Sequence, residues 1–353
     1  LTTTTSTGYA EARKRYRDKI LATGIFPLDF WPASRLAWRR IDPDAILLTE
    51  SELWPEHLHQ SKRRGVPAFL INARISDRSF ARYEKVPRLT QRLLRKFHAI
   101  FPSSETDARR LEQLGAPPHQ LHRCGSIKLD VPPPAPLDEA GRTALLASLG
   151  FDQASDAPPP ILLGASTWPG EEAALIRIFA RLMAEGIDCR LLLVPRHAER
   201  GGEIARLLRE QPHPWHQRSG GASPTQPIDI HLADTTGELS QLTQVADLCF
   251  IGKSLPPNIG GQSPVDGAGL GKPLLFGPQM SNFKDIAQAL LTAGAAREVA
   301  DEAALEAAIR ELLTAPEARS AMGQAGTAWH AANRGSCQRI ATIIDAHLQS
   351  RST

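Results

Sequence analysis

Two stretches in the second half of the chain place hydroxyl and basic side chains directly after apolar runs. Ser166 and Thr167 stand in a Gly-Ala-Ser-Thr segment, where small residues let the backbone approach an anion and the hydroxyls can donate to it. Arg196 and His197 follow the next apolar run, and a guanidinium suits bidentate binding of a phosphate or carboxylate. Both stretches indicate an anion site. The structural alternatives are a helix cap for the hydroxyls and a surface salt bridge for the arginine.

A third stretch is rich in glycine and is the most informative of the three. Gly260 and Gly261 suit a backbone with positive φ, and we expect a short helix whose first position is near Pro264. The start of that helix would direct the positive end of its dipole towards a phosphate. The stretch has neither the GxxxxGK[ST] spacing of a Walker loop nor a GxGxxG fingerprint, which disfavours ATP and NAD as ligands.

The first half carries charged residues after two other apolar runs. Glu50 and Glu52 stand with one residue between them at the end of an apolar run. We expect one to act in acid–base chemistry or hydroxyl binding and the other to cap the helix that begins at Pro55. Asn72 and Arg74 end the next apolar run, and beside the two glutamates they predict a polar pocket.

Apolar runs rich in β-forming residues alternate with amphipathic segments along the chain, which is typical of parallel sheets covered by helices on both faces. The Pro-rich segment 130–136 can continue neither a helix nor a central strand, so it predicts a domain boundary. We predict a first domain over residues 1–130, a linker over 131–138 and a second domain over 139–353. The last helix, 336–349, is a candidate for packing back towards the first domain.

The alternation also gives the individual elements. In the first domain we expect strands at 45–49, 68–72, 99–102 and 120–124, and helices near 9–20, 55–64, 87–97 and 104–114. In the second domain we expect strands at 160–163, 189–194, 228–232, 247–251 and 273–276, and helices at 139–149, 170–185, 199–209, 237–245, 284–293, 302–314, 316–330 and 336–349. Ligands bind beyond the carboxyl ends of such strands, which places the stretches above around one cleft.

Composition narrows the classes of function. The 353 residues, 42% hydrophobic and 22% charged, fit a globular chain of two domains. No run of 18 apolar residues exists to cross a bilayer, and the four scattered cysteines have no zinc spacing, so we expect no metal site. Residues 1–130 hold 23 Lys or Arg against 14 Asp or Glu, and this basic half suits a phosphorylated lipid or a membrane surface. With only 6% aromatic residues, nucleic-acid binding is disfavoured.

Taken in order, these motifs resemble those of the 3-deoxy-D-manno-octulosonic acid (Kdo) transferases. The resemblance begins at the Thr-rich opening and runs nearly to the C-terminus; no single motif is specific, but their common order is. The segments that carry it are Glu-Ser-Glu-Leu-Trp-Pro at 50–55, Asn-Ala-Arg-Ile-Ser at 72–76, Ser-Glu-Thr-Asp at 104–107, Gly-Ser-Ile-Lys-Leu-Asp at 125–130, Gly-Ala-Ser-Thr at 164–167, Pro-Arg-His at 195–197, Gly-Glu-Leu at 237–239 and Phe-Gly-Pro at 276–278.

The resemblance implies an α/β protein of the GT-B class, with two Rossmann-like domains facing a central cleft. It implies transfer of Kdo from CMP-Kdo to a lipid A precursor, with inversion and without a metal or other cofactor, by a peripheral protein on the cytoplasmic face of the bacterial inner membrane. Donor binding would fall to the second domain and acceptor binding to the first. The implied donor residues are Ser166, Thr167, Arg196, His197, Gly260, Gly261, Ser263 and Asp266; the acceptor side would hold Asn72 and Arg74, with Glu50 and Glu52 assisting catalysis.

The chain departs from the family pattern in several places. Ser263 and Asp266 stand where the family has Asn and Glu, and Trp168 replaces a usual His or similar polar residue. Family members also carry an N-terminal segment, before the residue that aligns with Leu1, that includes a membrane anchor, a central strand and the Glu expected to be the catalytic base. We therefore expect an incomplete first domain. Two alternatives stay open: a GT-B transferase with another sugar-nucleotide donor, and a catalytically inactive relative that binds a nucleotide or lipid.

Overall fold

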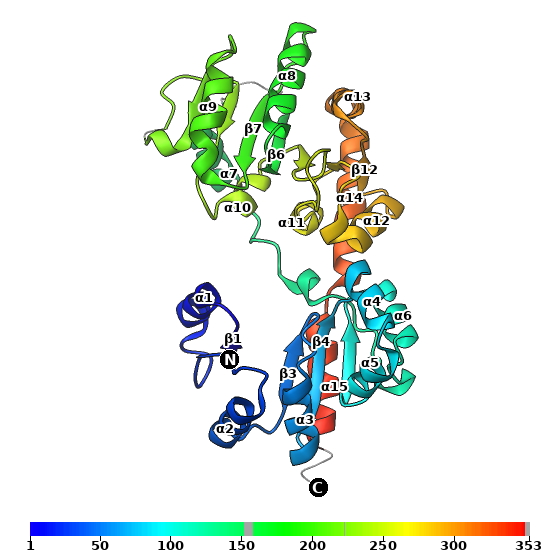
Figure 1. The fold of residues 1–353 in the computed structure, drawn as a ribbon. Helices are drawn as coiled ribbons and strands as arrows, with labels where there is room; N and C mark the ends of the chain where they lie inside the picture. The colour runs from blue at the N-terminus through cyan, green and yellow to red at the C-terminus, as the bar shows by residue number, and fades with distance from the viewer. Residues whose placement is uncertain (152–157, 222, 350–353) are drawn as a thin grey trace. The chain divides into compact units, whose positions relative to one another are not determined.

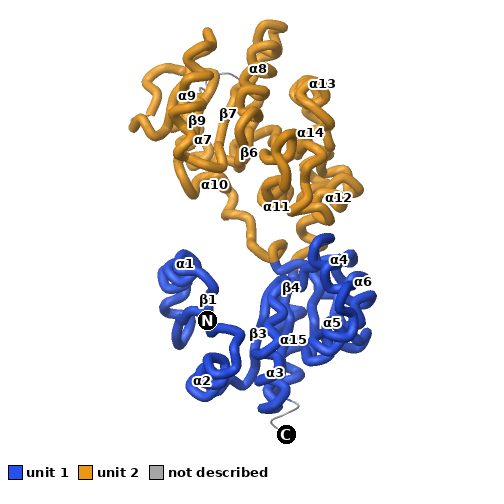
Figure 2. Tube along the Cα trace, viewed as in Figure 1, with its two compact units in different colours: residues 1–127, 335–353 blue, residues 128–334 orange. Residues whose placement is uncertain are grey.

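The computed structural model describes residues 1–151, 158–221 and 223–349 and divides into two compact units (Figure 2). Unit 1 comprises Leu1–Ile127 and Gly335–Thr353, and unit 2 comprises Lys128–Arg334. Unit 2 thus begins before the Pro-rich segment and ends at Arg334. The predicted range 139–353 differs from it at both ends.

Unit 2, which runs from green to orange in Figure 1, is built on one sheet of seven parallel strands in the order β12-β11-β10-β6-β7-β9-β8. Its strands are β6 (Ile161–Thr167), β7 (Arg190–Pro195), β8 (Trp215–Gln217), β9 (Ile230–Leu232), β10 (Leu248–Ile251), β11 (Leu274–Phe276) and β12 (Ala296–Glu298). Its helices are α7 (Glu139–Leu149), α8 (Glu171–Ala184), α9 (Gly201–Arg209), α10 (Leu239–Thr243), α11 (Val265–Gly269), α12 (Lys284–Thr292), α13 (Glu302–Thr314) and α14 (Pro316–Asn333).

Both faces of this sheet are buried. Leu163 of β6 packs in a cluster with Leu149 of α7, whereas its neighbour Leu162 packs in a second cluster with Phe179 of α8. Adjacent residues of a strand point to opposite faces of the sheet. Burial of both faces therefore explains why the strands are continuous apolar runs in the sequence. The prediction of a parallel sheet covered on both faces is confirmed for unit 2.

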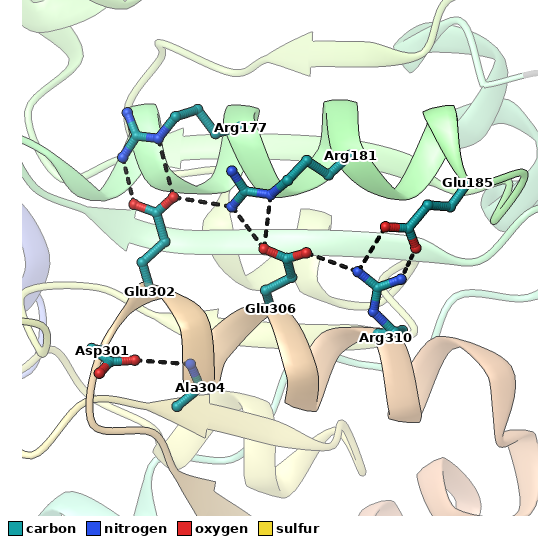
Figure 3. Close-up of polar contacts among 8 residues, drawn as sticks. All are labelled: Arg177, Arg181, Glu185, Asp301, Glu302, Ala304, Glu306 and Arg310. Carbon is teal, nitrogen blue, oxygen red and sulfur yellow. Dashed lines mark hydrogen bonds and ion pairs between the residues drawn. The ribbon is translucent and has the colours of Figure 1, made fainter.

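Ion pairs join α8 to α13, two helices that also contribute to the second cluster (Figure 3). Arg177 and Arg181 of α8 bind Glu302 at 2.5 and 3.1 Å, and Arg181 also binds Glu306 at 2.7 Å. Glu306 in turn binds Arg310 of its own helix at 2.8 Å. The arginines are partly exposed, so each pair contributes about 0.5 kcal/mol, and apolar burial remains the main force that holds α13 in place.

Unit 1 contains a parallel sheet in the order β3-β4-β5 and a separate parallel pair, β1-β2. Its strands are β1 (Thr2–Thr3), β2 (Gly24–Ile25), β3 (Ile46–Thr49), β4 (Ala68–Ala73) and β5 (Ala99–Pro102). Its helices are α1 (Ser6–Tyr16), α2 (Trp31–Ile41), α3 (Pro55–Arg64), α4 (Asp77–Glu84), α5 (Pro87–Leu94), α6 (Glu105–Gln113) and α15 (Ser336–Gln349). Among the described residues, β1 and β3 each pair with one strand only.

The last helix of the chain, α15, completes the core of unit 1. Ile340 is buried in a cluster with Phe69 of β4 and Phe101 of β5. Arg339 donates two hydrogen bonds to the carbonyl of Cys124, at 2.8 and 3.2 Å. The C-terminal segment is therefore part of the fold of unit 1.

The strand predicted at 120–124 is wrong. The segment enters through a 3-10 turn at Pro118–Gln120, and only Leu121 forms a bridge, to Ile100 of β5. The Cys124 N–H donates to the carbonyl of His122 at 2.9 Å, so the chain turns away from the sheet directly after this single bridge. No helix in the described part of the chain has the length and apolar character to cross a membrane.

Candidate functional site

The residues predicted to bind an anion come together at the carboxyl edge of the seven-stranded sheet. Ser166 and Thr167 end β6, Arg196 follows β7, and Gly260 lies in the loop after β10. These three strands are parallel, and β6 lies between the other two, so their ends share one edge. Ligands of parallel α/β sheets bind at this edge.

The end of β6 has an irregular backbone. Ser166 has φ +53°, in the left-handed region, and the pairing with β7 shifts register between Ala165 and Thr167. The Thr167 side chain is fully buried, and its hydroxyl has no hydrogen-bond partner among the described residues. A non-glycine residue with positive φ is uncommon and tends to occur at functional sites, which supports a ligand role for this turn.

Arg196 and His197 differ in their surroundings. The Arg196 backbone N–H donates to the carbonyl of Thr167 at 3.1 Å, whereas its exposed guanidinium has no partner within the described ranges. His197 Nδ1 lies 3.3 Å from a carboxylate oxygen of Glu199, and its ring contacts Trp168 edge to face, with centroids 5.3 Å apart. Arg196 is therefore available for an anionic ligand.

The glycine-rich loop adopts the predicted backbone but uses its own N–H groups. Gly260 and Gly261 have φ +121° and +70°, which confirms their need for left-handed freedom. Their N–H groups donate to the carbonyls of Gln279 and Lys253 at 3.0 and 2.9 Å. The two glycines therefore fix the shape of the loop, and their amides are not available to bind a phosphate.

The short helix after this loop begins one residue later than predicted. Pro264 is the capping residue and α11 starts at Val265, whose N–H lies 3.4 Å from the Ser263 hydroxyl. Asp266 is half-buried, and its carboxylate accepts a hydrogen bond from Ser240 of α10 at 3.2 Å. These contacts place Ser263 and Asp266 at the start of α11, beside the loop.

Glu171 joins two loops at this edge, a role that the spacing of residues in the sequence does not indicate. Its buried carboxylate accepts four backbone N–H groups, from Trp168, Lys253, Ser254 and Leu255, at 2.8–3.2 Å. Burial raises the pKa of this carboxyl, and the four hydrogen bonds act in the opposite direction. The available signal was a pair of glutamates at a predicted helix start, where carboxylates meet unpaired N–H groups.

The acidic and basic residues of unit 1 meet where β3 and β4 end. Glu50 has φ +55°, and its carbonyl accepts the N–H of Arg74 at 3.3 Å. Glu52 is half-buried two residues further on. Asn72 is buried instead: its amide oxygen accepts from Ser126 and Ile127 at 3.1 and 3.3 Å.

The prediction that Glu50 or Glu52 caps the helix at Pro55 is wrong. Asp29 accepts the N–H groups of Glu56 and His57, the second and third residues of α3, at 2.9 and 3.0 Å. The strand ends at Thr49, so both glutamates lie in a turn and the alternation expected of a strand does not apply to them. A cap from a residue 27 positions upstream in sequence has no local signal.

The described residues contain no group of three or more His, Cys, Asp or Glu side chains placed to hold a metal ion. Two glutamates near the candidate site are already bound to arginines: Glu172 to Arg200 at 2.7 Å and Glu238 to Arg218 at 2.7 Å. Arg196, by contrast, has no carboxylate partner among the described residues, which suits an anionic ligand.

Solved structures of similar shape define the class of fold. The Anabaena protein HepE, solved in complex with UDP, matches with a TM-score of 0.62 at 13% identity, over 98% of this chain and 91% of its own. A putative UDP-N-acetylglucosamine 2-epimerase from Listeria monocytogenes matches with a TM-score of 0.58 at 13% identity, over 97% and 87%. The chain therefore has the GT-B fold of nucleotide-sugar glycosyltransferases and epimerases.

Sequence comparison then gives the family. Residues 1–131 match the family model described as 3-deoxy-D-manno-octulosonic-acid transferase (kdotransferase). The 3-deoxy-D-manno-octulosonic acid transferases of Bordetella pertussis and Haemophilus influenzae are 33% and 31% identical, over 99% of this chain and 80% of each relative. The chain belongs to the Kdo transferase family of glycosyltransferases.

Proposed function

We propose that this chain transfers Kdo from CMP-Kdo to a hydroxyl of a lipid A precursor, by direct displacement with inversion at the anomeric carbon. The observation that carries the donor half is the Arg196 guanidinium, which has no partner among the described residues and lies at the carboxyl edge of the sheet, next to the left-handed turn at Ser166. Negative charge grows on the phosphate of the departing CMP, and a fixed cation stabilises that charge in the transition state. No metal is needed for this role.

The donor site we propose comprises the ends of β6 and β7 and the start of α11. The Ser166 and Thr167 hydroxyls, Arg196 and His197 would bind the phosphate and its surroundings, and Asp266 would accept hydrogen bonds from a sugar or ribose hydroxyl. Gly260 and Gly261 would contribute by fixing the shape of the loop after β10. Family membership and the shared edge of these residues support this assignment.

The acceptor site we propose lies at the ends of β3 and β4 in unit 1. A carboxylate there, Glu50 or Glu52, would assist removal of the proton from the acceptor hydroxyl. Arg74 would bind a phosphate of the lipid. Asn72 would support the loop from inside, because its side chain is buried on Ser126 and Ile127.

Peripheral contact with a membrane is also part of the proposal. Leu28, Phe30 and Trp31 are exposed large apolar residues near the start of α2, and Arg35 stacks over the Trp31 ring at 5.5 Å. Exposed apolar side chains next to basic ones suit the interface of an anionic bilayer. Binding to phosphatidylglycerol vesicles that falls for Phe30→Ser, and not for Leu89→Ser on α5, would support this contact; equal loss for both would count against it.

One observation favours a second candidate, transfer from another sugar nucleotide. Asp266 is one methylene shorter than the Glu expected from the family pattern, and Ser240 already donates to it. The shorter carboxylate, which already accepts one hydrogen bond, would contact the hydroxyls of a donor differently, and such contacts determine which sugar nucleotide is bound.

Calorimetric titration with CMP, CDP and UDP tests the donor. We expect CMP to bind most tightly and Arg196→Ala to weaken it by about tenfold, the value of one charged hydrogen bond. Tighter binding of UDP than of CMP would overturn the Kdo donor in favour of the second candidate. Transfer is followed by mass spectrometry of a lipid A precursor incubated with CMP-Kdo, and the anomeric configuration of the product by NMR.

A further inference from the structure

Lys253 has a backbone conformation that is unusual for a lysine. It follows β10 with φ +59°, in the left-handed region that favours glycine. Its N–H donates to Glu171 at 2.8 Å, and its carbonyl accepts the N–H of Gly261 at 2.9 Å. The backbone is therefore held from both sides in a conformation that fixes the direction of the side chain.

The Lys253 side chain is directed onto an aromatic ring. Its ammonium nitrogen lies 4.1 Å from the centroid of the Trp168 ring, and the same indole packs against the His197 ring in a T-shaped contact. The stem passes Gly260, where a Cβ atom would lie 3.6 Å from Lys253 Cε. Within the parts of the chain that the structure describes, no carboxylate pairs with this ammonium. The result is a positioned cation without a neutralising partner.

We propose that Lys253 is a further donor-binding residue and that Trp168 is the residue that positions it. A cation–π contact holds an ammonium without neutralising it, so the charge stays available to an incoming anion. Lysine binds phosphate as a point charge, and both a phosphate and a sugar carboxylate fit this chemistry. The inference rests on the proposed function, because the ligand it names is the anionic sugar nucleotide bound at the same sheet edge.

The test uses the full chain and the variant Lys253→Met, which keeps the stem and removes the charge. We expect it to bind CMP about tenfold more weakly and cytidine unchanged, which assigns the phosphate to Lys253. Unchanged CMP binding with a KM for CMP-Kdo raised about tenfold would assign the sugar carboxylate instead. Unchanged values for both ligands would overturn the proposal. Arg209→Ala, which removes an exposed charge from α9, controls for net charge and should leave CMP binding within about twofold.

Three further variants separate binding from structure. Lys253→Gly relieves the left-handed strain, so its melting temperature should not fall although its CMP affinity does. Lys253→Arg keeps the charge and should retain CMP affinity within about threefold. Trp168→Leu should weaken CMP binding in the wild type but add nothing to Lys253→Met, because both act through one ammonium. A lower melting temperature for Lys253→Gly with no rescue by arginine would show a purely structural role.

Different results would overturn the proposed function and the role of Lys253. If the wild-type chain does not bind CMP, the proposed function falls and this inference falls with it. If wild type and Lys253→Met bind CMP and use CMP-Kdo alike, the proposed function stands and only the role of Lys253 is overturned.

Discussion

The Glu171 carboxylate, in the first turn of α8, accepts the backbone N–H of Ser254 at 2.9 Å in the loop after β10. The two residues are separated by 83 positions in the chain. Through this bond and its three companions, one buried side chain joins the turn after β6 to the loop that carries Lys253 and Gly260. The backbone of the candidate donor site is therefore held by a carboxylate that is itself buried.

Replacing Glu171 by glutamine tests this dependence. In glutamine, an NH2 group replaces one of the two carboxylate oxygens. The two backbone N–H groups that donate to that oxygen in the wild type lose their acceptor, so two hydrogen bonds are lost and two buried donors are left unsatisfied. We expect Glu171→Gln to lower the free energy of unfolding by about 2–3 kcal/mol and to weaken CMP binding. Urea denaturation and calorimetry measure the two effects. Glu210→Gln, at an exposed position after α9, is the control, and equal behaviour of the two variants would contradict the role of Glu171.

A second buried carboxylate allows a comparison within one ion-pair group. Arg200 binds both Glu172, whose side chain is 1% exposed, and Glu203, whose side chain is 54% exposed. Removing the buried carboxylate leaves the arginine charge without its buried partner, which is costly. Removing the exposed carboxylate costs little, because water already screens that ion pair. We expect Glu172→Gln to cost about 3 kcal/mol and Glu203→Gln about 0.5 kcal/mol or less in urea denaturation. Similar losses for both variants would show that burial does not set the strength of this group.

The sequence predicts unit 2 better than unit 1, for a physical reason. Its central strands β6, β7, β10 and β11 are buried along their length, and helices follow them in the chain, so the alternation of apolar runs and amphipathic segments locates them. In unit 1, α2 was not predicted, because Trp31, Leu36 and Ile41 are exposed and blur its pattern. The short strands β8 and β12 are three residues each and leave no period to read.

The candidate site likewise contains residues that local rules predict and contacts that they do not. Glycines with positive φ and the strand-end arginine follow from local rules, so Gly260, Gly261 and Arg196 were predicted. Glu171, the cap from Asp29 and the Lys253–Trp168 contact join segments far apart in the chain. Such contacts depend on which strands become neighbours, and residue spacing does not contain that information.

His231 predicts how stability changes with pH. Burial lowers the pKa of His231 to about 4, from an ordinary value of 6.5. The unfolded chain then binds more protons than the folded chain between about pH 4 and pH 6.5, so stability is complete above pH 6.5 and is lost as the pH falls through this window. The loss amounts to about 3 kcal/mol by pH 4.

The variant His231→Phe isolates this contribution. The His231 ring packs against the rings of Phe151 and His216, and a phenyl ring can replace it in these contacts. The carbonyl of Leu149 then loses its hydrogen bond. We expect lower stability at pH 7.5 but a smaller decrease between pH 7.5 and pH 5 than in wild type. His119→Asn, at an exposed position, should keep the wild-type pH dependence. An unchanged pH dependence in His231→Phe would place the acid sensitivity on other groups.

The close approach of two backbones at the candidate site gives the last prediction. A Cβ atom on Gly252 would lie 2.3 Å from the carbonyl oxygen of Ser166 and 2.6 Å from Thr167 Cα. Gly252 cannot move away easily, because its N–H donates to Ala165 and its carbonyl accepts from Gln262. Gly252→Ala must therefore displace the left-handed turn at Ser166, and we expect it to lower stability by about 2 kcal/mol and to weaken CMP binding.

Gly202 provides the matched control for that substitution. It lies in α9 with nothing within 4 Å of a Cβ atom, so Gly202→Ala should raise stability by about 0.5–1 kcal/mol through its higher helix propensity and leave CMP binding unchanged. Thermal unfolding and calorimetry distinguish the two alanines. If Gly252→Ala unfolds and binds CMP like the wild type, the turn at Ser166 tolerates displacement, and its geometry is not what selects the anion.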